Sequence, residues 1–147
     1  MKHILSQYGE KKKVFISGLS LGGTICFWLA LKNPTLINGV IFLSPAFRGN
    51  SESQPFMKKL GWLMGKVFPK LLLVPQTFNQ QTKRDSSERI QNDPFVYKDK
   101  VVPGSIKAVL EAMESTESRW KEFTTPYILI QSGCDKLVDP FQAIDFE

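Results

Sequence analysis

A serine at the centre of a glycine-rich turn is the residue best suited to chemistry in this sequence. Residues 18–23 read Gly-Leu-Ser-Leu-Gly-Gly and place Ser20 in a G-x-S-x-G pattern between an apolar run and a helix-like stretch. On a sharp strand-to-helix turn a serine presents its hydroxyl above the sheet edge, and Gly18 and Gly22 make room for so tight a turn. The pattern predicts a nucleophilic Ser20, with the Leu21 N–H at the helix N-terminus donating to an oxyanion.

Other interpretations of this turn fit the residues less well. The bare pattern arises by chance in about one chain of this length in twenty, and the same residues also suit a merely close-packed turn. The position between a strand and a helix favours the nucleophile. Gly18 and Gly23 have the spacing of a phosphate-binding loop, but Thr24 stands where that loop requires lysine. Because no G-x-G-x-x-G pattern is present either, we exclude a phosphate-binding role for the turn.

Activating a serine requires a base, and the base requires a carboxylate that orients it. Asp135 follows the apolar run 127–130. If that run is a parallel strand, the carboxylate lies at the carboxyl edge of the sheet, where α/β active sites gather. Asp139 is the competing acid, and either aspartate also suits a role in capping or shaping a turn.

The elements that would position these residues alternate between strand and helix. Three apolar runs lack polar alternation, which is typical of parallel strands buried on both faces: 14–16, 40–43 and 127–130. Residues 24–32 are apolar nearly all round and end at Asn33-Pro34, so we expect a buried helix. Residues 105–123 carry an apolar stripe opposite charged residues and predict a helix that covers a sheet face. This order predicts an α/β fold with a parallel sheet.

The middle of the chain, residues 47–100, differs from the segments 1–46 and 101–147, and we interpret it as an insertion between core elements. Apolar residues recur there on one face of a predicted helix that Pro69 ends, with lysines on the opposite face. The apolar residues of this face are Phe56, Leu60, Leu63, Met64, Val67 and Phe68.

Composition sets the broad class of protein. A chain of 147 residues, 42% hydrophobic and 22% charged, has room for one core and is too apolar to be disordered. A net charge of +5 is too small and scattered to indicate nucleic-acid binding. Two cysteines, Cys26 and Cys134, exclude a disulfide framework and favour a reducing compartment. Residues 14–31 hold too many Gly, Ser and Thr residues for a leader or membrane span, so we expect a cytoplasmic protein.

Four motifs occur in the order in which a known family carries them. They are residues 14–23, 39–45, 92–94 and 126–140. Through them nearly the whole chain resembles the α/β-hydrolases, and among these the monoacylglycerol lipases, lysophospholipases and serine aminopeptidase-like hydrolases. The resemblance implies an α/β-hydrolase fold, in which a parallel-sheet core carries a helical cap at residues 47–100.

The resemblance also implies roles for individual residues. Ser20 matches the family nucleophile, Asp135 its triad acid, and Leu21 the source of one oxyanion-hole amide. The implied substrate is a small lipid ester, a glycerol monoester or a lysophospholipid, and no cofactor, metal or nucleic acid is required. The cap would bind the acyl chain through Phe56, Leu60, Leu63 and Met64. Its basic helix face suits transient, peripheral contact with a membrane surface as well as simple packing on the core.

The sequence departs from the family pattern at both ends. The family histidine follows the acid, whereas this sequence has His3 alone, in a region where the family has no catalytic histidine, so we interpret it as a surface residue. Family members also have strands before the serine, with a His-Gly loop that supplies a second oxyanion amide. We expect a partial domain, its N- and C-terminal portions missing, and inactive as written. The alternatives are a non-catalytic relative that binds lipid through its cap, and the same fold used for peptide or acyl-transfer chemistry.

Overall fold

Three parallel strands form the sheet of the protein. The computed structural model describes residues 12–49, 63, 65–68, 92–95, 102–135 and 137–146. Their order in the sheet is that of the sequence: β1 (Phe15–Leu19), β2 (Gly39–Leu43) and β3 (Tyr127–Ile130). The carboxyl ends meet at one edge, where Leu19, Leu43 and Ile130 are in register. The predicted parallel sheet and its three strands are confirmed.

The chain divides into two compact units. The first contains residues 1–50 and 112–147, and with them the sheet, while the second contains residues 51–111. In the second unit residues 63 and 65–67 are helical and Phe68 no longer is, in agreement with a helix end at Pro69. Among the described residues no helix has the length and hydropathy needed to cross a membrane.

Helix α2 (Leu21–Lys32) connects β1 to β2 and ends where the sequence predicts. The side-chain amide of Asn33 donates to the Leu29 carbonyl over 2.8 Å and satisfies one of the last orphan acceptors of the helix. Cys26, Phe27 and Ala30 are buried on one side, but Ile25 on the other side is 55% exposed. The expectation of a helix buried all round is therefore wrong for the described structure, in which α2 buries one side only.

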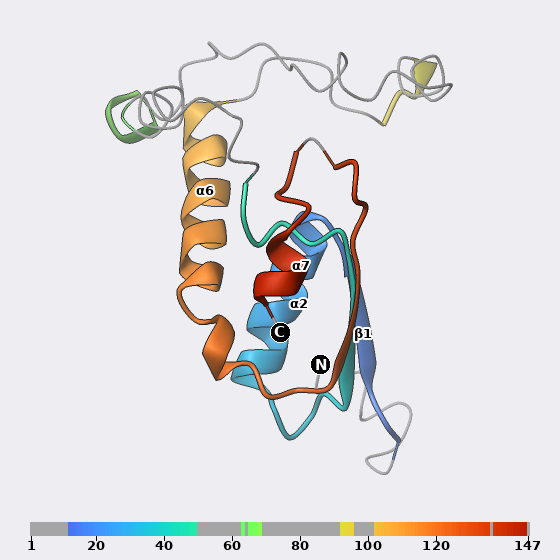
Figure 1. Ribbon diagram of the computed structural model, residues 1–147. Coiled ribbons are helices and arrows are strands. Elements are labelled where there is room, and N and C mark those ends of the chain that lie inside the picture. The colour runs from blue at the N-terminus through green and yellow to red at the C-terminus, as the bar shows by residue number, and fades with distance from the viewer. Residues whose placement is uncertain are drawn as a thin grey trace. The chain divides into compact units, whose positions relative to one another are not determined.

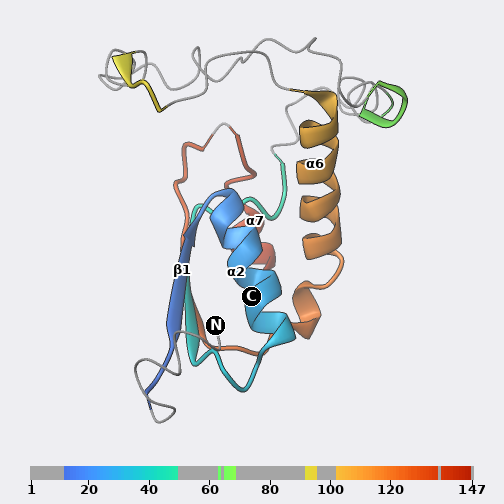
Figure 2. The ribbon, with the colours of Figure 1, turned by 180° about the vertical axis from the view of Figure 1, so that it is seen from behind.

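Among the described residues, helices cover one face of the sheet and leave the other face exposed. Helices α2 and α7 (Gln142–Asp145) lie on the same side of the strands in both ribbon views (Figure 1; Figure 2). The opposite face carries apolar side chains that are 57–67% exposed: Phe15, Leu19, Ile128 and Ile130. The prediction of strands buried on both faces therefore holds best for the central strand β2 and fails for β1 and β3. The described helices cover a single face, and these two strands each lack a second neighbour among the described residues.

The predicted helix at residues 105–123 forms two elements. Helix α6 (Pro103–Glu117) is followed by a short 3-10 helix, η1 (Trp120–Glu122). The Ser118 hydroxyl donates to the Ser115 carbonyl over 2.8 Å, a side-chain bond that competes with the helical backbone where α6 stops. In the last turn of α6, the buried Thr116 hydroxyl accepts a 2.9 Å hydrogen bond from the Trp28 indole. This bond fixes the end of α6 to α2.

Aromatic side chains from distant parts of the sequence form the core. Phe27 of α2 stacks on Phe123, and Phe42 of β2 meets Phe47 edge-on, both with ring centroids 5.0 Å apart. Phe146, just after α7, packs against these rings. Each such pair contributes about 0.5–1.5 kcal/mol beyond its buried area. The residues after β3 are therefore part of the core.

Candidate functional site

The backbone at Ser20 is held in a conformation that non-glycine residues rarely adopt. Ser20 has φ 52° and ψ −121°, a type of strain that costs about 1–3 kcal/mol and persists only where the surroundings impose it. Here the Ser20 N–H donates to the Leu43 carbonyl over 3.0 Å. The Ser20 carbonyl accepts from the amides of Gly23 and Ala46, both over 2.9 Å. Three backbone hydrogen bonds therefore fix the turn.

The side chain of Ser20 is free for chemistry. Ser20 occupies the N-cap position of α2, yet its hydroxyl makes no capping hydrogen bond, and the residue is exposed. Within the described structure no acceptor engages the Leu21 N–H, one of the orphan donors expected in the first turn of a helix. An exposed hydroxyl beside a free helical amide is the arrangement that nucleophilic attack and oxyanion binding require.

The glycines around Ser20 have unequal roles. A Cβ on Gly18 would lie 2.2 Å from the Gly22 carbonyl oxygen, and one on Gly23 would lie 2.5 Å from the Pro45 Cβ. A Cβ on Gly22 would meet nothing within 4 Å. The prediction that the turn needs a residue without a side chain is confirmed at Gly18 and is wrong at Gly22. The second glycine that the turn requires is Gly23.

Asp135 shapes the loop that follows β3. Its Oδ1 accepts the amides of Leu137 over 2.9 Å and Val138 over 3.1 Å, and its own N–H donates to the Ser132 carbonyl. These bonds make a turn of the kind aspartate favours, and they leave Oδ2 without a hydrogen bond among the described residues. Asp135 is partly buried and follows β3 at the same sheet edge at which Ser20 follows β1.

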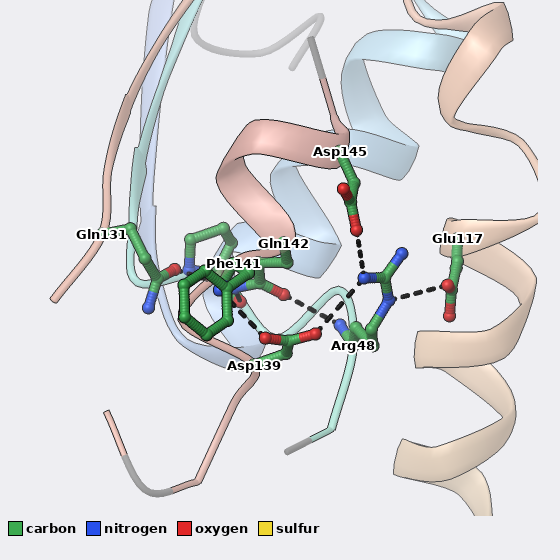
Figure 3. Close-up of polar contacts among 8 residues, drawn as sticks. Arg48, Glu117, Gln131, Asp139, Phe141, Gln142 and Asp145 are labelled. Carbon is green, nitrogen blue, oxygen red and sulfur yellow. Dashed lines mark hydrogen bonds and ion pairs between the residues drawn. The ribbon is translucent and has the colours of Figure 1, made fainter. Parts of the chain in front are cut away.

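Asp139, the competing acid, is already engaged. Its Oδ1 accepts the Phe141 amide over 2.9 Å, and its Oδ2 lies 3.2 Å from Nη1 of Arg48. Figure 3 shows Asp139 between these two partners. Both oxygens of Asp139 therefore have partners, whereas Oδ2 of Asp135 has none among the described residues.

Arg48 forms ion pairs with three carboxylates near the candidate site. Its guanidinium contacts Glu117 at 2.7 Å and Asp145 at 2.5 Å besides Asp139, as Figure 3 shows, and lies 4.8 Å from the centre of the Trp120 ring. Partial burial lowers the pKa of Arg48, but its hydrogen bonds to these carboxylates outweigh burial and raise the pKa above its ordinary value. Arg48 therefore stays charged and ties α6 and α7 to the segment after β2.

That segment, residues 44–48, lies between the two candidate catalytic residues, and we call it the bridging segment. On one side the Ala46 N–H donates to the Ser20 carbonyl, and the Ala46 carbonyl accepts the Thr24 hydroxyl over 2.6 Å. On the other side the Ser132 N–H donates to the Ser44 hydroxyl over 3.2 Å. Ser44 has a positive φ of 38°, so the backbone is strained here as well as at Ser20.

Of the residues predicted to bind the acyl chain, the structure describes Leu63 alone. Leu63 is 51% exposed, and Val67 and Phe68 nearby are also about half exposed. Phe56, Leu60, Met64 and His3 lie outside the described residues. Among the described residues no group of three His, Cys, Asp or Glu side chains is placed to hold a metal ion.

Sequence reasoning missed the residues that connect the two halves of the site. Thr24 could have been noticed, because it is a polar residue in an apolar helix and its hydroxyl is buried on the bridging segment. Arg48 and Gln142 gave no comparable signal, since nothing local indicates partners some 70–100 residues away in the chain.

Comparisons with known proteins identify the family to which this chain is similar. Residues 1–147 match the family described as serine aminopeptidase, S33. The curated relatives include the monoglyceride lipase of Rattus norvegicus, 30% identical over 128 residues, and the monoglyceride lipase homolog of monkeypox virus, 30% identical over 129 residues. These matches cover 86% of this chain but only 42% and 46% of the relatives. The chain thus spans less than half the length of the curated relatives it matches.

Two solved structures extend the comparison to the fold. The monoacylglycerol lipase of Paleococcus ferrophilus superposes with a TM-score of 0.77 at 25% identity, over 99% of this chain and 56% of that one. A soluble variant of the Saccharomyces cerevisiae monoglyceride lipase, in complex with a substrate analog, gives 0.78 at 19% identity, over 99% and 52%. The predicted α/β-hydrolase fold and the resemblance to the monoacylglycerol lipase group are confirmed.

Proposed function

This chain belongs to the serine aminopeptidase S33 family, and we propose that it is a serine hydrolase of carboxylic esters with Ser20 as its nucleophile. The observation that carries the proposal is the turn at Ser20. The residue is held at positive φ by three backbone bonds, and its exposed hydroxyl makes no capping bond. Strain of this kind at a functional side chain is typical of a nucleophile held ready for attack.

The proposed mechanism gives one role each to Ser20, Leu21 and Asp135. The Ser20 hydroxyl attacks the ester carbonyl, and the Leu21 N–H donates to the oxyanion that forms. Through its free Oδ2, Asp135 orients a histidine. That histidine takes the serine proton and gives it to the leaving alcohol. Water then releases the acyl group by the same steps. The described residues contain no histidine, so this base is supplied from outside them.

We propose a monoacylglycerol or lysophospholipid as the substrate class. The names of the curated relatives support a glycerol monoester. In the second unit, Leu63, Val67 and Phe68 expose about half of their apolar surface, which supports binding of an acyl chain there. We assign Phe56, Leu60 and Met64 to the same acyl-binding role on the sequence pattern. The cap predicted at residues 47–100 would carry them, although Phe47 at its start packs in the core with Phe42.

The test of the nucleophile is covalent labelling with a fluorophosphonate. The protein isolated from its source cells should react at one serine, and fragment mass spectrometry of residues 14–32 should place the adduct on Ser20. Ser20→Ala should abolish labelling. Ser17→Ala is the matched control, because Ser17 is an exposed serine of the preceding strand, and it should label like the wild type. An unlabelled wild type, or labelling that survives Ser20→Ala, would contradict the proposal.

The intact mass of the same isolated protein tests where the base resides. A species well above 16.7 kDa with a reactive Ser20 agrees with a histidine carried on the same polypeptide. A species of 16.7 kDa with an unreactive Ser20 would instead favour the alternative, a non-catalytic relative that binds lipid through the exposed apolar side chains of its second unit.

A further inference from the structure

The side chain of Gln142 is fully buried, and both its amide nitrogen and its carbonyl oxygen make hydrogen bonds. Gln142 is the first residue of α7, and its exposed fraction is 0%. Its Nε2 donates to the Pro45 carbonyl over 2.6 Å and to Oε1 of Gln131 over 2.8 Å, while its Oε1 accepts the Arg48 N–H over 2.9 Å. Both donors of the amide and one acceptor site are used, so the side chain has one orientation available to it.

These three bonds join the two loops of the candidate site. Pro45 and Arg48 belong to the bridging segment, whose Ala46 amide binds the Ser20 carbonyl. Gln131 directly follows β3 and begins the loop that contains Asp135. Figure 3 shows Gln142 between Gln131 and Arg48. A path of hydrogen bonds and backbone thus runs from the turn at Ser20 through Gln142 to the acid loop, beside direct contacts such as the bond from Ser132 to Ser44.

Resting on the function proposed above, we propose that Gln142 is a positioning residue, which sets the distance between the Asp135 loop and the Ser20 turn. Asp135 itself is partly exposed and is held mainly by bonds within its own loop. Bonds within a loop fix its shape but not its place relative to β1. The buried amide of Gln142 supplies part of that placement. The ion pair between Arg48 and Asp139, the bond from Ser132 to Ser44, the Asp139 N–H donated to the Arg48 carbonyl and the backbone bridge between Gly49 and Val138 contribute as well.

The variant Gln142→Met tests the role, because methionine is similar in length and has neither an amide donor nor a carbonyl acceptor. We expect the rate of fluorophosphonate labelling at Ser20 to fall about 10- to 100-fold, the range that a misplacement near 1 Å produces. With a soluble ester substrate, kcat should fall by a similar factor while KM changes less than about twofold, because Gln142 does not touch the substrate.

Thr116→Val is the matched control. Thr116 is equally buried, and its hydroxyl likewise serves a distant partner, the Trp28 indole, but it has no bond to the bridging segment. It should lower the unfolding temperature as Gln142→Met does and leave labelling at Ser20 within about twofold of the wild type. Equal loss of labelling in the two variants at equal loss of stability would overturn the proposal, because Gln142 would then be merely structural.

Two further measurements keep the proposal falsifiable. If Gln142→Met does not fold, Gln131→Met removes the partner of Gln142 on the acid loop, together with the 3.3 Å bond from Gln131 to the Ser132 carbonyl, and labelling should fall about threefold. If the Gln131→Met variant labels like the wild type, the proposal fails. Hydrogen exchange of the Ala46 amide needs no activity: it should be faster in Gln142→Met than in the wild type and unchanged in Thr116→Val. A wild type that never labels would refute the catalytic function, while the exchange rates would still decide whether Gln142 holds the bridging segment.

Discussion

The turn at Ser20 and the loop around Asp135 lie at the same sheet edge but are held in place in different ways. Backbone hydrogen bonds and the absence of side chains at Gly18 and Gly23 fix the turn. The loop depends on side chains, namely the carboxylates of Asp135 and Asp139. The turn is therefore fixed by glycine sterics and by backbone bonds to β2 and the bridging segment, whereas the loop is shaped by side-chain bonds to its own neighbouring amides.

The largest expected effect distinguishes the two aspartates of the loop. In the active protein, Asp135→Asn should lower kcat by about three to four orders of magnitude, as loss of the orienting carboxylate does in serine hydrolases. Asp139→Asn should lower kcat far less, because that carboxylate is occupied by Arg48 and the Phe141 amide. Steady-state kinetics of both variants checks this. A larger loss in Asp139→Asn would exchange the roles of the two residues.

A second prediction concerns the turn. Gly18→Ala should destabilise the protein by about 3 kcal/mol, because the new Cβ would meet a backbone oxygen that cannot move aside. Gly22→Ala, its control within the same motif, meets open space and should stabilise α2 by about 0.5 kcal/mol. Urea denaturation of both variants gives the two free energies of unfolding. Equal destabilisation would show that the two glycines share one role.

The third prediction concerns the ion pairs that Arg48 makes with three carboxylates. Arg48→Met should cost about 1–2 kcal/mol, because it removes three charge-assisted bonds and leaves three carboxylates close together, although solvent screens a side chain that is 26% exposed. Asp145→Asn removes one partner and should cost less. Chemical denaturation at low salt measures both. If Arg48→Met is neutral, the loop is held by the remaining hydrogen bonds alone.

The smallest effect on stability is expected for the ion pair between Arg119 and Glu122, which lies outside both the turn and the loop. It serves as a reference for the contribution of an exposed ion pair. The hydrogen bond from Arg119 lowers the pKa of Glu122 below its usual value. A depressed carboxyl pKa contributes stability above the unfolded-state pKa, and this is lost as the pH falls through the folded-state pKa. The unfolding midpoints of the wild type and Glu122→Gln should therefore differ slightly at pH 7 and converge below about pH 4. A difference that grows on acidification would reverse the assigned sign.

The parts of the molecule that the sequence predicted are those with local causes. The G-x-S-x-G pattern located the turn, because a tight strand-to-helix connection restricts the residues that can form it. Apolar runs located β1, β2 and β3, and an apolar stripe opposite charged residues located α6. Asp135 was reached through its place after a parallel strand. The structure places it at that edge, while its catalytic role stays a prediction.

The parts that could not be predicted depend on distant residues. Gln142 and Arg48 become informative only once the fold brings 131, 142 and 44–48 together. The break between α6 and η1 coincides with a hydrogen bond of the Ser118 hydroxyl, a residue that has little weight in an amphipathic pattern. The bare sheet face escaped prediction because unbroken apolar runs indicate burial but do not say what covers them.

Within the described part of the chain, the exposed sheet face gives the molecule one apolar side. Phe15, Leu19, Ile128 and Ile130 form an apolar plane, while a net charge of +5 keeps neighbouring molecules apart. Salt weakens the repulsion by shortening the Debye length to about 10 Å at 0.1 M, and sulfate or phosphate also strengthens apolar attraction. Both effects act in the same direction. The colloidal stability of the 147-residue chain should therefore decline steadily with ionic strength, and low-salt buffers should keep it dispersed.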